Sequence, residues 1–247
     1  MWENIGSDKC ETYIERHFGK KGRGEPSKPA ITISRAEGAG GLTVSSELVR
    51  YLQAHTANHE VWTVFDQMLV MKVLEVFNMK GRIGDFMKED HKGTVTDAFE
   101  EFIGLHPSTW SLVERTNATI KRLAEIGNVI LVGRGGNIVT AEMKNVFHVR
   151  LVGSFDKRVE RAMTVFGYDE KTAINYIKKR DIGRKRYVKD NFDADIDDPL
   201  LYHLVINTDF ISYEDAAQLI GAEVIRRYKL DAPVKKPTMT GQRAAVF

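Results

Sequence analysis

The sequence predicts an α/β domain in which a parallel β-sheet lies between layers of helices. Short apolar, β-branched runs alternate with longer segments of helical periodicity between residues 30 and 230, and this alternation is typical of right-handed parallel β-α-β units. A glycine cluster joins the first predicted strand to the first predicted helix. With 247 residues, 43% of them apolar, the chain can bury one sizeable core, so we expect one domain.

Four strands are predicted along the chain. Each is a short run of mainly branched apolar residues next to a turn or a helix, as in strands that are buried on both faces of a parallel sheet. They are Ala30–Ser34, Asn128–Val132, Val146–Val152 and Leu201–Ile206.

Helices are predicted where apolar residues recur at helical spacing. Asp66 and Asp156 each stand at the start of one such segment and are predicted to be N-caps. The predicted helices are Val44–His55, Phe65–Phe77, Thr96–Gly104, Ser108–Ile126, Ser154–Phe166, Asp169–Tyr187 and Tyr213–Tyr228.

The two ends of the chain differ in composition from the predicted domain at residues 30–230. Residues 1–29 are polar and rich in Gly, Lys and Glu, and residues 231–247 carry prolines among basic residues, so we expect a polar extension and a disordered tail. The single cysteine, Cys10, excludes an internal disulfide, and no segment is apolar over the length of a membrane span. We therefore expect a cytoplasmic protein.

The glycine-rich turn after the first strand is a candidate phosphate-binding loop. It spans residues 34–43 and contains Gly38, Gly40 and Gly41. Glycines let the backbone approach a phosphate chain closely, and the N-terminus of the following helix attracts the anion. In the strict motif G-x-x-x-x-G-K-[ST], a lysine would stand at Gly41 and the opening glycine at Arg35. A tight turn that binds nothing is the alternative interpretation of this segment alone.

A second candidate is Gly133-Arg134-Gly135-Gly136, directly after the predicted strand Asn128–Val132. Ligands of parallel sheets collect at the carboxyl ends of the strands. An arginine held there between glycines can form paired hydrogen bonds to a phosphate or carboxylate. Arg134 is therefore predicted to bind such a group, and a surface arginine on a loop is the alternative.

A formal net charge of only +2 gives no support to a general role in binding polyanions, but cations cluster locally. The segment from Tyr176 to Phe192 contains seven basic residues and only two acidic ones, Asp181 and Asp190. On a helix Asp181 and Arg184 share a face, so the aspartate can orient the arginine toward a phosphate. This segment is predicted to be a lid that closes over a phosphoryl-transfer site and excludes water. A solvated helix face is the alternative.

The order of several short motifs resembles the cytidylate kinase-like family of P-loop proteins. The motifs are Ile31-Thr32-Ile33-Ser34-Arg35, Gly38-Ala39-Gly40-Gly41, Phe65-Asp66, Val132-Gly133-Arg134-Gly135, Arg158-Val159-Glu160-Arg161, Asp181 with Arg184 and Tyr187, and Asp198-Pro199 ahead of Tyr202-His203-Leu204-Val205-Ile206-Asn207-Thr208. The resemblance implies a three-layer P-loop kinase-type fold, in which residues 79–107 form an acceptor-side helical region and residues 169–192 an arginine-rich helical lid.

The resemblance further implies ATP as phosphoryl donor, Mg²⁺, and a nucleoside monophosphate similar to CMP or dCMP as acceptor. The residues matching the donor phosphate loop are Gly38, Ala39, Gly40, Gly41, Leu42 and Thr43. The Thr43 hydroxyl would lie on the metal side, Arg134 matches an acceptor-side arginine, and Asp181 with Arg184 matches the lid pair. Arg35 would partly replace the missing lysine.

Two other interpretations stay open. Because a glycine replaces the loop lysine at Gly41, the chain would also fit a non-catalytic, nucleotide-binding regulatory protein with a degenerate P-loop. The weaker interpretation is that the basic lid and tail bind nucleic acid, which would make the affinity fall steeply with salt. The sequence by itself names neither the acceptor nor the oligomeric state.

Overall fold

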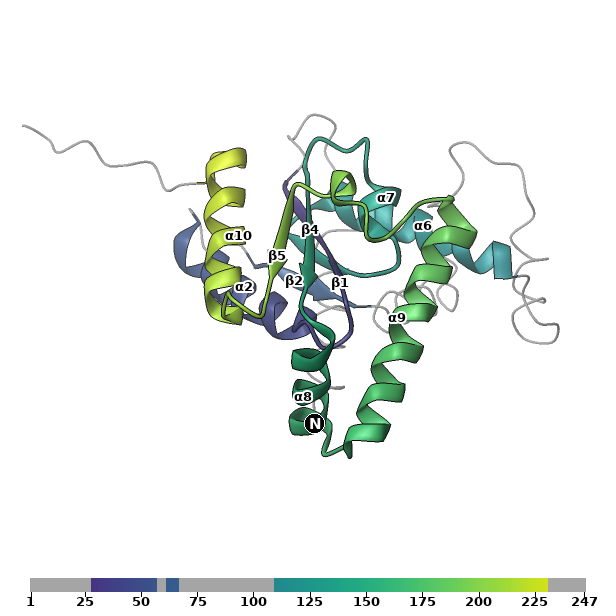
Figure 1. Ribbon diagram of the computed structural model, residues 1–247. Helices are drawn as coiled ribbons and strands as arrows, with labels where there is room; N and C mark the ends of the chain where they lie inside the picture. Colours follow the sequence, from purple (N-terminus) through teal and green to yellow (C-terminus); the bar gives the residue numbers. More distant parts are fainter. Residues whose placement is uncertain (1–27, 57–60, 67–108, 231–247) are drawn as a thin grey trace, which may run out of the picture.

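The computed structural model describes residues 28–56, 61–66 and 109–230, and a parallel five-stranded sheet forms the centre of this part of the chain (Figure 1). The strands are β1 (Ala30–Arg35), β2 (Thr63–Phe65), β3 (Val129–Val132), β4 (Val146–Val152) and β5 (Leu204–Asn207). Their order in the sheet is β2-β3-β1-β4-β5. Each pairing is parallel, so the carboxyl ends of the strands share one edge of the sheet.

Helices cover both faces of the sheet and extend beyond its carboxyl edge. The elements are α2 (Gly41–His55), α6 (Thr109–Ile126), α7 (Gly136–Val139), α8 (Phe155–Phe166), α9 (Glu170–Phe192), the 3₁₀ turn η2 (Pro199–Leu201) and α10 (Tyr213–Tyr228). Figure 1 shows α2 and α10 side by side on one face, with α6 and α7 toward the other. The pair α8 and α9 extends past the carboxyl edge, where α9 runs back alongside the sheet.

The main core lies between the sheet and the layer formed by α2 and α10. Ile31 and Ile33 of β1 are fully buried there, in one cluster with Leu48 of α2 and Val224 of α10. Because side chains alternate along a strand, the intervening residues of β1 point to the opposite face.

The opposite face of the sheet changes character along the strands. Near the amino ends it is apolar, where Ala30 packs in a cluster with Ile120 and Leu123 of α6. Toward the carboxyl ends it carries the buried polar residues Ser34 of β1 and Arg150 of β4, which are partners in the strand register. The charged side chain of Arg150 therefore lies beside α9.

The predicted fold class is confirmed, and most element bounds agree with the prediction. Strand β4 and helix α10 have the predicted bounds. Helix α2 begins at Gly41, earlier than predicted, because the glycine turn leads straight into it. Helix α9 continues to Phe192, beyond the predicted end at Tyr187.

Three local predictions were wrong. Phe65 does not start a helix but ends β2, an edge strand of three residues that is too short to show alternation. Asp156 is not an N-cap, since Ser154 holds that position in α8 and its backbone N–H donates to Asp209 Oδ2 at 2.7 Å. The segment before Leu204, predicted as strand, contains the turn η2.

Other predictions fall on residues outside the described ranges. These are the helix Phe65–Phe77 beyond Asp66, the helix Thr96–Gly104, the acceptor-side region 79–107, almost all of the extension 1–29 and the tail 231–247. Within the described ranges, no helix combines the length and the apolar character needed to cross a membrane.

Candidate active site

The glycine-rich turn leads from β1 into α2 at the carboxyl edge of the sheet. Gly38 and Gly40 have φ angles of 78° and 81°, which side chains rarely tolerate. A Cβ at Gly38 would lie 2.9 Å from the Arg158 carbonyl oxygen, and one at Gly40 would lie 2.2 Å from Cε1 of Tyr213. The turn therefore packs so tightly against α8 and α10 that both positions require glycine.

The N-terminus of α2 is shaped to receive an anion. The N-cap residue, Gly40, has no side chain to bind the first N–H groups of the helix, and the first turn contains no acidic residue. Unbound N–H groups and the helix dipole together favour a phosphate at this position. Leu42 and Thr43 in the first turn are exposed.

Arg35, at the end of β1, occupies the space where the missing lysine would begin. Its stem covers Gly41, where a Cβ would lie 3.0 Å from Arg35 Cγ. Its guanidinium reaches Gly133, where a Cβ would lie 2.1 Å from Arg35 Nη1. Arg35 thus bridges the two glycine-rich segments that the sequence singled out.

The charge of Arg35 is poorly compensated. Among the described residues its guanidinium makes no hydrogen bond or ion pair. Burial and the positive charge of Arg184 lower its pKa to about 10, while Glu37 and Asp66 act in the opposite direction. A partly buried guanidinium that forms no close ion pair is stabilised when an anion binds to it.

Arg134 lies between the turn after β3 and the lid helix. Its backbone is left-handed, with φ 55°, and its guanidinium stacks over the ring of Tyr187 in α9 at 5.1 Å. Gly135 packs against the ring of Phe192 at the end of the same helix. The structure therefore brings the second predicted motif against the predicted lid.

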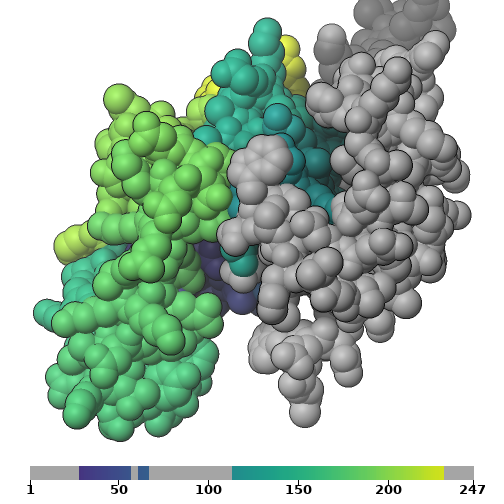
Figure 2. All heavy atoms as spheres, turned by 90° about the vertical axis from the view of Figure 1, so that its right-hand side faces the viewer, coloured from purple at the N-terminus to yellow at the C-terminus, as the bar shows by residue number. Residues whose placement is uncertain are grey.

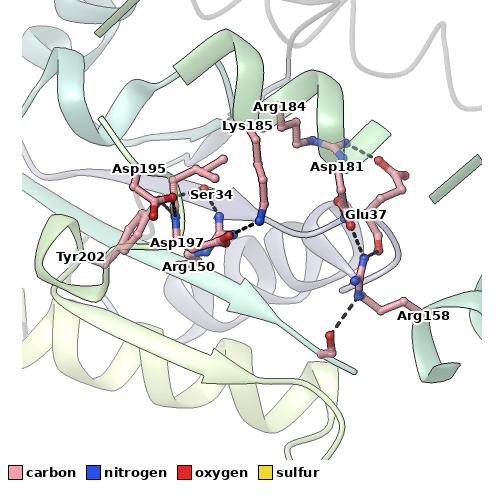
Figure 3. A network of polar contacts seen from close by, with 12 residues as sticks. Ser34, Glu37, Arg150, Arg158, Asp181, Arg184, Lys185, Asp195, Asp197 and Tyr202 are labelled. Atoms are coloured by element: carbon pink, nitrogen blue, oxygen red, sulfur yellow. Dashed lines mark hydrogen bonds and ion pairs between the residues drawn. The ribbon is translucent and has the colours of Figure 1, made fainter. Parts of the chain in front are cut away.

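The predicted lid pair is present, but each member has a stronger partner (Figure 3). Asp181 accepts from Arg158 Nη1 at 2.6 Å and from the backbone N–H of Glu37 at 2.8 Å, whereas Arg184 lies 3.7 Å away. Arg184 instead pairs with the carboxylate of Glu37, which also accepts from Tyr176 at 3.3 Å. In this arrangement α9 is bound to the glycine-rich turn itself.

Helix α9, the turn and the carboxyl ends of β1 and β4 enclose a cavity of about 440 Å³. Its charged lining consists of six cationic and two carboxylate side chains: Arg35, Arg150, Arg158, Lys178, Arg184 and Lys185 against Asp181 and Asp197. In Figure 2 the early part of the described chain, in purple, is visible in a hollow beside the green α9. Such a lining favours a strongly anionic ligand.

Several residues of this site were not singled out in the sequence. They are Glu37, Arg150 and Asp197. For Arg150 a signal was present, because an arginine in the middle of a buried apolar strand needs a specific partner. For Glu37 and Asp197 no local pattern predicts the partner.

The described residues contain no group of three or more His, Cys, Asp or Glu side chains that would enclose a metal ion. Magnesium ions at phosphate sites are generally held by substrate phosphates together with as little as one protein oxygen. The exposed hydroxyl of Thr43 in the first turn of α2 is suited to be that oxygen.

A parallel sheet of this order, with a glycine-rich turn between β1 and the helix that follows it and a basic helix over its carboxyl edge, defines a P-loop kinase fold. Within that class, the chain belongs to the cytidylate kinase-like family, whose model matches residues 30–210. The family relationship points to nucleotide phosphoryl transfer.

Relatives with known names agree with this assignment. A cytidylate kinase of Pyrococcus horikoshii is 27% identical over 202 residues, which are 80% of this chain and 88% of that protein. A cytidylate kinase of Thermoplasma volcanium is 26% identical over 140 residues, 56% of this chain and 73% of that protein.

Two further matches are less informative about activity. A uronate isomerase of Corynebacterium glutamicum is 28% identical over 101 residues, 41% of this chain, and the match spans 20% of that protein. The crystal structure of an uncharacterized protein from Eubacterium ventriosum aligns with a TM-score of 0.59 and 21% identity, over 80% of this chain and 98% of that one. This likeness concerns the fold.

Proposed function

We propose that the protein transfers the terminal phosphoryl group of ATP to a nucleoside monophosphate similar to CMP or dCMP, or to a similarly small acceptor. The observation that carries this proposal is the position of Arg35. Its partly buried side chain extends from Gly41, which its stem covers, to Gly133, which its guanidinium reaches, and within the described residues this guanidinium makes no hydrogen bond or ion pair. A cation there would neutralise charge on the transferred group, which is the main demand of phosphoryl transfer.

The roles of the other residues follow from their places. The backbone N–H groups of residues 38–43 would hold the donor phosphates, together with Arg35. The Thr43 hydroxyl would help to hold Mg²⁺, which would supply positive charge to the phosphates. Arg134 and Arg184 would bind the acceptor phosphate or the transferred group, and Asp181 would orient the lid helix.

The guanidinium of Arg184 pairs with the carboxylate of Glu37. A phosphate carries more negative charge than a carboxylate and offers three oxygens to a guanidinium. We therefore expect the donor or acceptor phosphate to displace Glu37 and to take Arg184 as its partner, so that ligand binding rearranges the contact between turn and lid.

The test is to incubate the protein with Mg-ATP and each ribo- and deoxyribonucleoside monophosphate while following ADP formation. We expect one acceptor class to stimulate turnover, and Arg35→Ala to lower kcat/KM by roughly 100-fold, as for other lost donors to a developing charge. Arg50→Ala is the matched control, since Arg50 is an exposed arginine of α2 that pairs with Glu47 and does not line the cavity. The double variant Arg134→Ala, Arg184→Ala should show no ADP formation that depends on the acceptor.

The rival function is nucleotide binding without turnover, in a regulatory protein. The glycine at position 41 and the engagement of Arg184 by Glu37 are the observations that favour it. If ATP binds but none of the acceptors stimulates ADP formation, the kinase proposal fails and this one replaces it.

A further inference from the structure

Arg150 is a charged residue in the interior of the sheet. It belongs to β4, where it is the register partner of Ser34 in β1, and its side chain is only 6% exposed. Nη1 donates to Ser34 Oγ at 2.9 Å, and the guanidinium lies 5.7 Å from the ring of Tyr202. A buried cation of this kind needs an anionic partner.

The partner of Arg150 is a carboxylate from a loop. Asp197 follows α9 and is 43% exposed, and its Oδ1 accepts from Arg150 Nη2 at 2.5 Å. Its other oxygen, Oδ2, lies 2.5 Å from Nζ of Lys185 in the lid helix. Figure 3 shows the two cations converging on Asp197 from the sheet and from α9. One carboxylate therefore serves two cations.

These residues line the same cavity as Arg35 and Arg184. Within that cavity Arg184 Nη1 is buried without a hydrogen-bond partner. Among the described residues, the lining thus carries more cationic than carboxylate side chains. A ligand with phosphate groups would supply the missing negative charge.

We propose that Arg150 and Lys185 form a second phosphate-binding position in this cavity, and that Asp197 occupies it until a phosphate displaces the carboxylate. The planar guanidinium would bind two oxygens of the phosphate, and Lys185 would act as a point charge beside it. The ligand class is a phosphate dianion, either free or as the monoester of a small substrate. The proposal rests on the proposed function in one respect, namely that the cavity receives phosphorylated ligands.

The experiment measures the equilibrium binding of inorganic phosphate and of CMP to the full chain at fixed ionic strength. We expect Asp197→Asn to raise the affinity for both ligands about tenfold, since it removes the competitor. Arg150→Met should lower the affinity about tenfold, and Lys185→Gln, a change at an exposed position, should lower it by a smaller factor. If the substitutions change the affinity for CMP but not for inorganic phosphate, the position binds a phosphate monoester and not free phosphate.

The control for net charge is Asp193→Asn. Asp193 is 90% exposed, pairs with Lys189 at 2.5 Å and does not line the cavity, so this variant loses the same charge from a similar pair. If Asp193→Asn strengthens binding as much as Asp197→Asn does, the effect is general electrostatics and the proposal is overturned. It is also overturned if Asp197→Asn weakens binding or leaves it unchanged.

The readout separates this proposal from the proposed function. If the nucleotide assay shows no turnover but Asp197→Asn still strengthens phosphate binding selectively, the kinase proposal fails and the second position stands. If Arg35→Ala abolishes turnover while Asp197→Asn has no effect on binding, only the second position fails. Repeating the binding series in the Arg35→Ala background removes the contribution of the donor loop.

Discussion

At the scale of single residues, Arg35 and Gly41 share one space beside the glycine-rich turn. The stem of Arg35 covers the site where a side chain at position 41 would begin. A lysine at position 41 therefore requires the stem of Arg35 to shift by a few tenths of an ångström.

This close contact leads to a prediction for substitutions at positions 35 and 41 that compensate for one another. Gly41→Lys alone should not raise turnover, because the new Cβ would lie 3.0 Å from Arg35 Cγ. The double variant Arg35→Ala, Gly41→Lys should recover at least about tenfold in kcat/KM over Arg35→Ala, because neighbouring substitutions are not additive. Steady-state kinetics on the four proteins gives the answer. No recovery in the double variant would show that the two positions do not supply the same charge.

His148 gives a prediction for pH. Its Nδ1 lies 2.8 Å from the buried Thr32 hydroxyl, and burial together with the neighbouring His203 lowers its pKa to about 4 from the ordinary 6.5. The unfolded chain therefore binds more protons than the folded one between these values, so stability falls as the pH drops through this window, by at most about 3 kcal/mol.

Urea unfolding at pH 7 and pH 5 measures this loss. His148→Leu should flatten the pH dependence in this window, even if it lowers the stability at pH 7. His55→Gln, at an exposed position on α2, should leave the dependence as in the original chain. Equal losses in the original chain and in His148→Leu would assign the effect to other groups.

At the scale of elements, α9 is held over the turn by a set of charged contacts. Glu37 binds Arg184 and Tyr176, while Asp181 binds Arg158 and the backbone of Glu37. These contacts link the glycine-rich turn to α8 and α9, which follow it more than 100 residues later in the chain. The position of α9 over the turn therefore depends on the carboxylates of Glu37 and Asp181.

Glu37→Gln should loosen the lid helix. The substitution keeps the shape of the side chain but leaves the partly buried Arg184 without its main counter-charge, which is destabilising. We expect hydrogen exchange of the backbone amides in residues 176–186 to become about tenfold faster, equivalent to about 1.4 kcal/mol of local opening. Glu170→Gln, at the exposed start of α9, is the control. Unchanged exchange would mean that the Asp181–Arg158 pair holds the helix by itself.

At the scale of the whole molecule, α2 and α10 form a layer that closes the main core. Gly221 of α10 allows the two helices to approach, because a Cβ there would lie 2.3 Å from Cδ1 of Tyr51 in α2. The ring of Tyr51 is stacked on His55 at 4.1 Å between ring centroids, which limits how far the Tyr51 ring can move. The spacing of this layer is therefore set by one glycine.

Two glycine-to-alanine changes should have opposite effects on global stability. Gly183→Ala in α9, where nothing lies within 4 Å of the added methyl, should stabilise the protein by roughly 0.5–1 kcal/mol through helix propensity. Gly221→Ala should destabilise it by about 1–3 kcal/mol, because overpacking exceeds the same gain. Denaturant unfolding compares the two. Stabilisation by both variants would show that the α2–α10 layer has room to spread.

Much of the fold was predictable because its signals are local. Strand β4 is a continuous buried run, and α10 begins at a Ser212 cap and ends where Lys229 adopts a left-handed backbone, so their bounds follow from nearby residues. The three-residue strand β2 and the cap of α8 were not predictable, since the first is an edge strand and the second uses Asp209 from the connection between β5 and α10.

The sequence by itself determined the alternation of strands and helices, the glycine-rich turn and the clustering of cations in α9, because periodicity and backbone preference act over a few residues. Only the tertiary structure decided which charges meet. Helical spacing pairs Arg184 with Asp181, yet its closer partner is Glu37, 147 positions away, and Arg150 meets Asp197 across 47 positions. Such pairs form because parallel crossovers return distant segments to one edge of the sheet. A charge that is buried there is destabilising unless an opposite charge lies beside it.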